Sequence, residues 1–186
     1  MKNRKSKNKK GKKRMEADTK VGAYKKLEHT FEPVYNKESK ILILGSFPSV
    51  KSRENQFYYG HPQNRFWKVL ATITKSSLPV TIEEKKKILQ KHNIALWDVV
   101  QSCSIIGSSD SSIRNVVVND ISKLLKTANI RKIYANGGKA YELYRKYVYQ
   151  QTKREIEKLP STSPANASYQ MERLCQEWGR ILLEEK

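Results

Sequence analysis

Short apolar runs alternate with amphipathic stretches from residue 40 onward, and this alternation constrains the fold more than any other feature of the sequence. The run from Lys40 to Gly45, KILILG, is continuous and ends in glycine, which is typical of a strand buried on both faces. Segments 93–100, 131–135 and 154–159 are the other strand candidates. Strands that alternate with helices pair in parallel, with helices on both faces of the sheet. We therefore predict a three-layer α/β/α sandwich around a short, mainly parallel four-stranded sheet.

Helical periodicity in the intervening segments supports this arrangement. Apolar residues recur at helical spacing in 64–73, 81–92, 119–128, 139–149 and 169–183. Thr81 is followed three residues later by Glu84, the pattern of a capping box at a helix start. In open sheets of this type, ligands bind beyond the carboxyl ends of the strands. The candidate site segments are therefore 45–64, 101–119, 136–138 and 160–166.

A strongly basic N-terminus precedes this pattern. The chain has 37 Lys and Arg against 18 Asp and Glu, a formal net charge of +19, and residues 1–14 contribute nine cations and no acid. Like charges without apolar residues cannot form a core. We predict that residues 1–28 form a disordered basic tail and lead-in, and that residues 29–186 form a single domain. The remainder keeps a net charge of +10, which favours nucleic acid over a membrane surface as partner.

Several classes of protein do not fit this sequence. No apolar run approaches the roughly 20 residues of a transmembrane helix, and the charged N-terminus lacks the apolar region of a signal peptide. Two cysteines, Cys103 and Cys175, indicate a reducing, cytoplasmic environment rather than a disulfide framework. With three scattered histidines they cannot build a Cys-rich zinc site or hold an iron–sulfur cluster. Composition leaves a histidine–carboxylate metal site open, but no ligand spacing suggests one.

The segment 45–67, GSFPSVKSRENQFYYGHPQNRFW, is long for a strand-to-helix connection, and long loops in compact domains tend to be functional. Three consecutive aromatic residues, Phe57 to Tyr59, offer rings that can stack on nucleobases. His61 and Asn64 follow them. The alternative is a packed aromatic loop, in which His61 is a structural hydrogen-bonding residue and Asn64 caps a helix. Taken alone, the residues favour this alternative.

Two later segments are equally ambiguous. The stiff segment 159–169, LPSTSPANASY, is rich in hydroxyl groups and suits contacts to phosphates. Its alternative is a helix entry capped by Ser163 or Asn166. The Ser-rich segment 101–119, which contains Asp110, is expected to be a flexible surface loop for most of its length.

Together these segments resemble the uracil-DNA glycosylase superfamily, and within it the hypoxanthine-DNA glycosylase branch, the DNA-deoxyinosine glycosylases. The similarity covers about residues 29–183 in order, and YYGHPQNRFW at 58–67 is its most specific part. LPSTSPANA at 159–167 resembles the loop that enters the DNA minor groove in this superfamily. The other matching segments are ILILGSFPS at 41–49, ALWDVV, GSSDSSIRN and ND within 95–120, and ANGGKA at 135–140.

The resemblance implies a monofunctional glycosylase of base excision repair, which extrudes a deaminated nucleotide and hydrolyses its N-glycosidic bond without a metal or cofactor. Many relatives have an acidic or amide residue where this chain has Phe47, and Leu159 replaces a histidine of some relatives. The resemblance places the essential role on Asn64, which orients the water and donates to the base or sugar, with His61 as a donor to a phosphate or the departing base. The resemblance also implies base contacts from Gly45, Ser46, Phe47, Phe57, Tyr58 and Asn136, and DNA contacts from Ser49, Pro160, Ser161, Thr162 and Ser163.

The same segments bear on whether hypoxanthine or uracil is the main substrate. Hypoxanthine and uracil share a carbonyl beside a ring N–H, and the pairs Ser46-Phe47 and Trp97-Asp98 suggest a looser pocket than a uracil-selective enzyme needs. We expect excision of hypoxanthine from double- or single-stranded DNA, with uracil as a secondary substrate. The alternatives are a uracil-DNA glycosylase of the same fold and a non-catalytic nucleic-acid-binding protein. We expect a cytoplasmic monomer, associated with the nucleoid if the source is prokaryotic, and no membrane partner.

Overall fold

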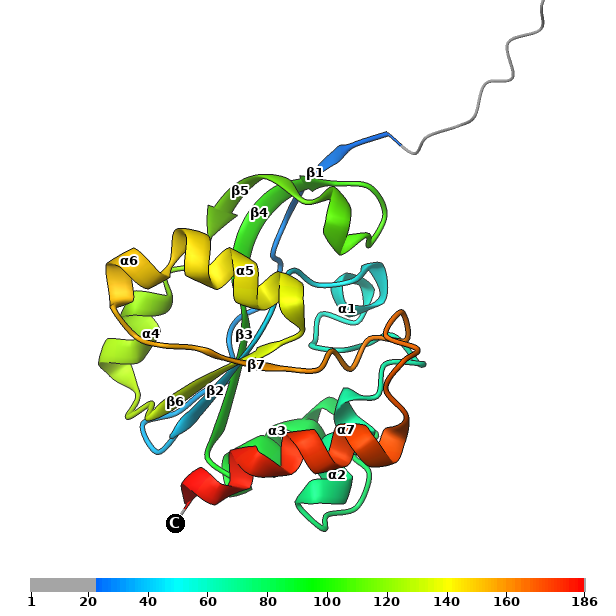
Figure 1. The fold of residues 1–186 in the computed structure, drawn as a ribbon, viewed down its shortest axis with the longest axis vertical. Coiled ribbons are helices and arrows are strands. Elements are labelled where there is room, and N and C mark those ends of the chain that lie inside the picture. Colours follow the sequence, from blue (N-terminus) through cyan, green and yellow to red (C-terminus); the bar gives the residue numbers. More distant parts are fainter. Residues whose placement is uncertain (1–22, 186) are drawn as a thin grey trace, which may run out of the picture.

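The computed structural model describes residues 23–185, and a four-stranded parallel sheet lies at its centre (Figure 1). The strand order is β3-β2-β6-β7. The strands are β2 (Ile41–Gly45), β3 (Ile94–Asp98), β6 (Lys132–Asn136) and β7 (Glu157–Leu159). Every residue of β2 is buried, as its continuous apolar sequence predicts for a central strand. β7 is shorter than the segment 154–159 expected for it.

Helices cover both faces of this sheet, so the predicted three-layer α/β/α sandwich is confirmed (Figure 1). Side chains of a strand point alternately to its two faces. Leu42 and Leu44 therefore pack into one core, and Ile41 and Ile43 into the other. The first core lies under α4 (Ile121–Thr127), α5 (Gly138–Tyr147) and the short α6 (Tyr149–Thr152). The second lies under α2 (Phe66–Ile73), α3 (Ile82–Lys91) and α7 (Met171–Trp178), which continues as the 3₁₀ segment η2 (Gly179–Glu185).

A second, antiparallel sheet in the order β1-β4-β5 differs from the sequence expectation. The segment 93–100, expected to be one strand, divides at Val99, and the chain continues directly into β4. Most of 101–119, expected to be a flexible loop, pairs as a hairpin. Buried and exposed side chains follow no regular alternation in these strands, so the sequence carries no periodicity that would predict the hairpin. The elements are β1 (Lys25–Glu28), β4 (Val100–Ile105), the 3₁₀ turn η1 (Asp110–Ser112) and β5 (Arg114–Val118).

The folded domain begins before the expected boundary at residue 29, because the backbone of β1 pairs with β4. The side chains of β1 are largely exposed. The basic segment 1–14 lies outside the described residues. The capping box expected at Thr81 and Glu84 is present at the start of α3. Among the described helices, none combines the length and apolar character needed to cross a membrane.

Candidate active site

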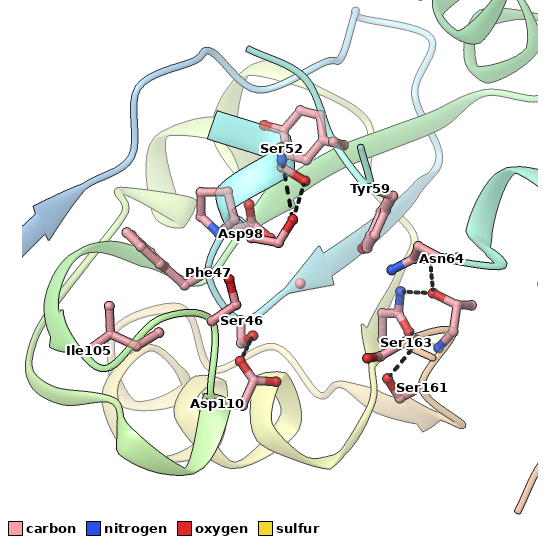
Figure 2. Close-up of a pocket in the computed structure, with 17 residues that line it drawn as sticks. Ser46, Phe47, Ser52, Tyr59, Asn64, Asp98, Ile105, Asp110, Ser161 and Ser163 are labelled. Atoms are coloured by element: carbon pink, nitrogen blue, oxygen red, sulfur yellow. Dashed lines mark hydrogen bonds between the residues drawn. The ribbon is translucent and has the colours of Figure 1, made fainter. Parts of the chain in front are cut away.

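The carboxyl ends of the parallel strands meet around a small polar cavity. Strand register sets Gly45 beside Asp98, and Asn136 beside Leu159. The cavity has a volume of about 120 Å³, comparable with the roughly 150 Å³ cavity that holds benzene in another protein, so it suits a small molecule or part of one rather than a large ligand. It is lined by Gly45, Ser46, Phe47, Pro48, Ser49, Ser52, Tyr58, Tyr59, Asn64, Asp98, Ile105, Ser108, Asp110, Asn136, Ser161, Thr162 and Ser163 (Figure 2).

Asn64 presents its amide NH₂ group to this cavity, because its oxygen is already engaged. Oδ1 accepts hydrogen bonds from the backbone N–H of Phe66 and from Oγ1 of Thr162, each at 2.9 Å. A backbone N–H can only donate, so the contact with Phe66 fixes which end of the amide faces the helix. The NH₂ group is left facing the cavity, on the same side as Tyr59 (Figure 2). Asn64 therefore offers a hydrogen-bond donor to the cavity.

The orientation of Asn64 depends on the neighbouring strand end. Thr162 is completely buried. Its hydroxyl accepts from Nδ2 of Asn136, and its backbone N–H donates to Oδ1 of the same residue, each at 2.9 Å. A continuous hydrogen-bonded chain thus runs from Asn136 through Thr162 to Asn64. Networks of this kind hold their members in one geometry when every member is satisfied.

Arg65 fastens the loop after β7 to the start of α2. Its guanidinium donates to the backbone carbonyls of Thr162, Ser163, Asn166 and Tyr169. Its own backbone N–H donates to the carbonyl of Thr162 at 3.0 Å. The planar fork of five donors is suited to several acceptors at once. The loop that resembles the minor-groove element is therefore held by the residue next to Asn64.

Gly45 allows two polar side chains to approach the strand end closely. A Cβ atom at this position would lie 2.1 Å from Oδ1 of Asp98 and 3.4 Å from the hydroxyl of Tyr59. No side chain tolerates the first distance, so only glycine fits here. Tyr59 itself adopts a left-handed backbone conformation, with φ of 52°, and its ring stacks on Phe66 at 4.0 Å between centroids.

Asp98 is buried and paired with His29. Nε2 of His29 lies 2.8 Å from Oδ2 of Asp98, and the two side chains are 3% and 6% exposed. The backbone carbonyl of Asp98 accepts from Nδ2 of Asn119 at 2.9 Å. His29, 69 positions earlier, therefore holds the carboxylate of Asp98, and Asn119, 21 positions later, holds its backbone.

The opposite wall of the cavity is the loop after β2. Ser46 donates to Oδ1 of Asp110 at 2.7 Å. Desolvation raises the pKa of Asp110 above its ordinary value, although the residue keeps exposed surface and the hydrogen bond from Ser46 opposes the shift. Arg53 stacks over the Phe47 ring at 5.5 Å and donates to the Pro48 carbonyl, so it fixes this loop.

Most of the residues expected at the site line the cavity, but three do not. Phe57 is 6% exposed and stacks on Trp67 inside the second core, so it is not available to a base. His61 lies outside the lining, and its Nδ1 accepts from the backbone N–H of Gln63. Pro160 also lies outside and accepts from Nε1 of Trp178 through its carbonyl.

Two of the residues that do line the cavity have other roles than expected. Thr162 is too deeply buried to contact a phosphate and instead links Asn136 to Asn64. The Tyr58 ring is 2% exposed, and its hydroxyl donates to the Glu32 carbonyl, so its face is not free to stack on a base.

Sequence reasoning gave no site role of their own to several residues that line or support the cavity, among them His29, Tyr59, Asp98 and Asp110. The pair Trp97-Asp98 entered the argument on pocket size, but Asp98 received no role, although it is the last residue of β3, where the strand-end rule places site residues. Asp110 lay in a candidate segment but was assigned no role. No local signal marks His29, whose contact with the site depends on the tertiary fold. No three His, Cys, Asp or Glu side chains within residues 23–185 lie close enough to share a metal ion.

The fold and this cavity define a class of α/β protein with its site at the carboxyl edge of a parallel sheet. The chain matches the Uracil DNA glycosylase superfamily over residues 32–182, and it belongs to that superfamily.

Particular relatives share much of the chain. A protein of Methanosarcina acetivorans named "Hypoxanthine DNA glycosylase" is 38% identical over 160 residues, which cover 83% of this chain and 98% of that protein. A protein of Methanosarcina barkeri with the same name is 35% identical over 114 residues, 60% of this chain and 72% of the relative. The solution NMR structure of a Methanosarcina acetivorans protein, provisionally named a uracil DNA glycosylase, aligns with a TM-score of 0.72 and 36% identity. That alignment covers 83% of this chain and 96% of the other.

Proposed function

We propose that this protein is a monofunctional DNA glycosylase that excises deaminated bases, mainly hypoxanthine from deoxyinosine, in base excision repair. Membership of the superfamily and the names of two relatives support this assignment. The single observation that carries it is the fixed orientation of the Asn64 amide, whose NH₂ group faces the cavity.

A donor at this position selects among bases by hydrogen-bond polarity. Hypoxanthine presents a carbonyl oxygen where adenine presents an exocyclic amine, which is itself a donor. The Asn64 NH₂ group can therefore donate to hypoxanthine, whereas adenine would place two donors against each other. As the glycosidic bond breaks, negative charge collects on the departing base, and a donor already in place stabilises that charge without reorganisation.

The lining residues favour direct hydrolysis of the glycosidic bond over a covalent intermediate between the enzyme and the sugar. Bifunctional enzymes form a Schiff base through an amine, usually of lysine. Within the described residues the cavity lining contains no lysine. A positively charged chain further suits a DNA substrate, and a weakly paired deaminated nucleotide is extruded from the duplex at lower cost.

The test is base release from duplexes that contain one deoxyinosine, one deoxyuridine or normal bases only, with enzyme in excess and abasic sites scored by alkaline strand cleavage. We expect fast release of hypoxanthine, slower release of uracil and none of adenine. Fast release of uracil without release of hypoxanthine would overturn the substrate assignment. Absence of release from every duplex would overturn the enzymatic function.

Two variants of Asn64 separate its catalytic role from its structural one. Asn64→Ala should lower base release at least ~100-fold, the scale for losing a positioned polar group, but it also removes the acceptor used by Phe66 and Thr162. Asn64→Asp keeps that acceptor and removes the donor. We expect Asn64→Asp to retain the wild-type melting temperature while losing release to a similar degree. An active Asn64→Asp variant would show that the amide does not act as a donor.

A further inference from the structure

A water that attacks the sugar needs a proton acceptor, and Asn64 is unsuited to this role because its oxygen already accepts two hydrogen bonds. At the position where many relatives have an acidic or amide residue, this chain has Phe47, whose ring cannot accept a proton. Among the described lining residues, the carboxylates are Asp98 and Asp110. If a carboxylate accepts the proton of the water, it is therefore Asp98 or Asp110.

Asp98 and Asp110 differ in how firmly they are held. Asp110 is exposed, lies in the short turn η1, and is engaged by Ser46 through Oδ1. Asp98 is the last residue of the buried strand β3, the outer neighbour of β2 in the parallel sheet, and is 4% exposed. His29 engages Oδ2 of Asp98, so Oδ1 remains beside Gly45 at the cavity. A group that acts in a transition state must be held in place beforehand, and Asp98 meets this requirement.

The hydroxyl of Tyr59 gives an independent indication that a small polar molecule binds here. It is buried beside the same point of Gly45 as Oδ1 of Asp98, and it has no hydrogen-bond partner in the described structure. Burial, reinforced by the Asp98 carboxylate, raises the pKa of Tyr59 well above its ordinary value. The Asn136 amide near the hydroxyl acts in the opposite direction, but its Nδ2 and Oδ1 are both bonded to Thr162. A buried hydroxyl without a partner is costly, and such groups are usually satisfied by ordered water.

We propose that Asp98, oriented by His29, is the general base of this site and that the Tyr59 hydroxyl is the second contact of the hydrolytic water. The inference rests on the proposed glycosylase function. The water oxygen bonds to C1′ while a water proton moves to Oδ1 of Asp98. The C1′–N bond breaks, and its electron pair leaves with the base, which Asn64 stabilises and which is then protonated from Asp98 or solvent. The sum is hydrolysis, with no other reactant.

The pH dependence of base release distinguishes this role from a structural one. The titratable groups that face Asp98 are His29 from the segment after β1, Tyr58 and Tyr59 from the loop after α1 (Val50–Glu54), and Asp110 from η1. A general base must be deprotonated, so the single-turnover rate should rise with pH with unit slope and then level off. Asp98→Asn should lower the plateau rate ~100-fold and abolish this acidic limb. Asn still accepts from His29, so the melting temperature should stay near that of the wild type.

The matched control makes the same chemical change outside the site. Asp120 caps α4 by accepting from the backbone N–H of Lys123, and asparagine caps helices equally well. Asp120→Asn should keep the wild-type rate, acidic limb and melting temperature. Asp110→Asn tests the competing carboxylate, and loss of the acidic limb in that variant but not in Asp98→Asn would overturn the assignment.

Tyr59→Phe gives a second test that does not depend on the stability of the Asp98 variant. The change removes a buried hydroxyl without a partner, so a purely structural role predicts equal or higher melting temperature and an unchanged rate. Our proposal predicts the same melting behaviour with a rate lowered about tenfold, the equivalent of one hydrogen bond. A wild-type rate in Tyr59→Phe would overturn the water site. Inactivity of the wild-type protein would refute the glycosylase function itself, whereas activity in Asp98→Asn with an intact acidic limb would refute only this inference.

Discussion

Arg65 offers the sharpest test of how the site is held together, through the substitution Arg65→Lys. The guanidinium donates to four carbonyls, of which the contact to Thr162, at 3.4 Å, is the weakest. Lysine presents a point charge instead of a fork and can keep one of the three stronger contacts. Removing two charge-assisted hydrogen bonds at about 1.5 kcal/mol each predicts a destabilisation of about 3 kcal/mol. For a domain of this size the melting temperature should fall by about 6–12 °C.

Three measurements report on Arg65→Lys: thermal unfolding, amide hydrogen exchange of the loop 161–169, and single-turnover base release. We expect faster exchange in this loop and slower base release, because Thr162 orients Asn64. Arg180→Lys is the matched control. Arg180 donates to one carbonyl, that of Lys158 at 2.6 Å, which lysine can keep. If Arg65→Lys melts and exchanges like Arg180→Lys, the loop is held by other interactions and the reasoning is wrong.

Three further predictions concern other parts of the molecule. Gly45→Ala should displace the Asp98 carboxylate, lowering stability by about 1–3 kcal/mol and base release ~100-fold; wild-type kinetics would contradict the close approach at this strand end. Hydrogen bonds from the backbone N–H groups of Thr81 and Val80 lower the pKa of Glu84 below its ordinary value. A lowered pKa stabilises the fold at pH above the ordinary value of 4.5, and this stabilisation disappears as pH falls through the lowered pKa. Glu84→Gln should therefore have a lower melting temperature than wild type at neutral pH and the same melting temperature in acid. A difference in melting temperature that does not depend on pH would show that the charge of Glu84 is not the cause. Deleting residues 1–14 should leave the single-turnover rate unchanged and reduce the salt slope of DNA affinity by about 0.9 for each phosphate that the tail neutralises; an unchanged slope would mean that the tail does not bind DNA.

The sheet and its helices were predictable because their signals are local. The apolar run of β2 indicates burial on both faces, and Thr81 with Glu84 marks the start of α3 before any tertiary contact is known. The rule that sites lie beyond the carboxyl ends of parallel strands then located the cavity, because strand direction alone brings Gly45 and Asn136 to one edge.

The remaining features depend on tertiary interactions that no local pattern records. β1 has mostly exposed side chains and is defined by its pairing with β4, so its sequence resembles a linker. Phe57 and Tyr59 stand two residues apart in an irregular loop, where no periodicity tells which ring enters the core and which faces the cavity. The pairing of His29 with Asp98 joins residues 69 positions apart, and it can be found only once the strands are placed.

The convergence of strand ends has a consequence for how chemistry can be distributed in this fold. Side chains from Asp98, Asn136 and the loops that follow β2 and β7 all reach one cavity, although they belong to segments far apart in the chain. A polar group that faces the cavity can therefore come from any of these strand ends, because residues from each of them line the same cavity. An apolar residue such as Phe47 can stand at one of these positions while an equivalent polar group is supplied from the next strand. Engineered variants can exploit this interchangeability by moving a carboxylate or an amide between adjacent strand ends while the sheet itself stays unaltered.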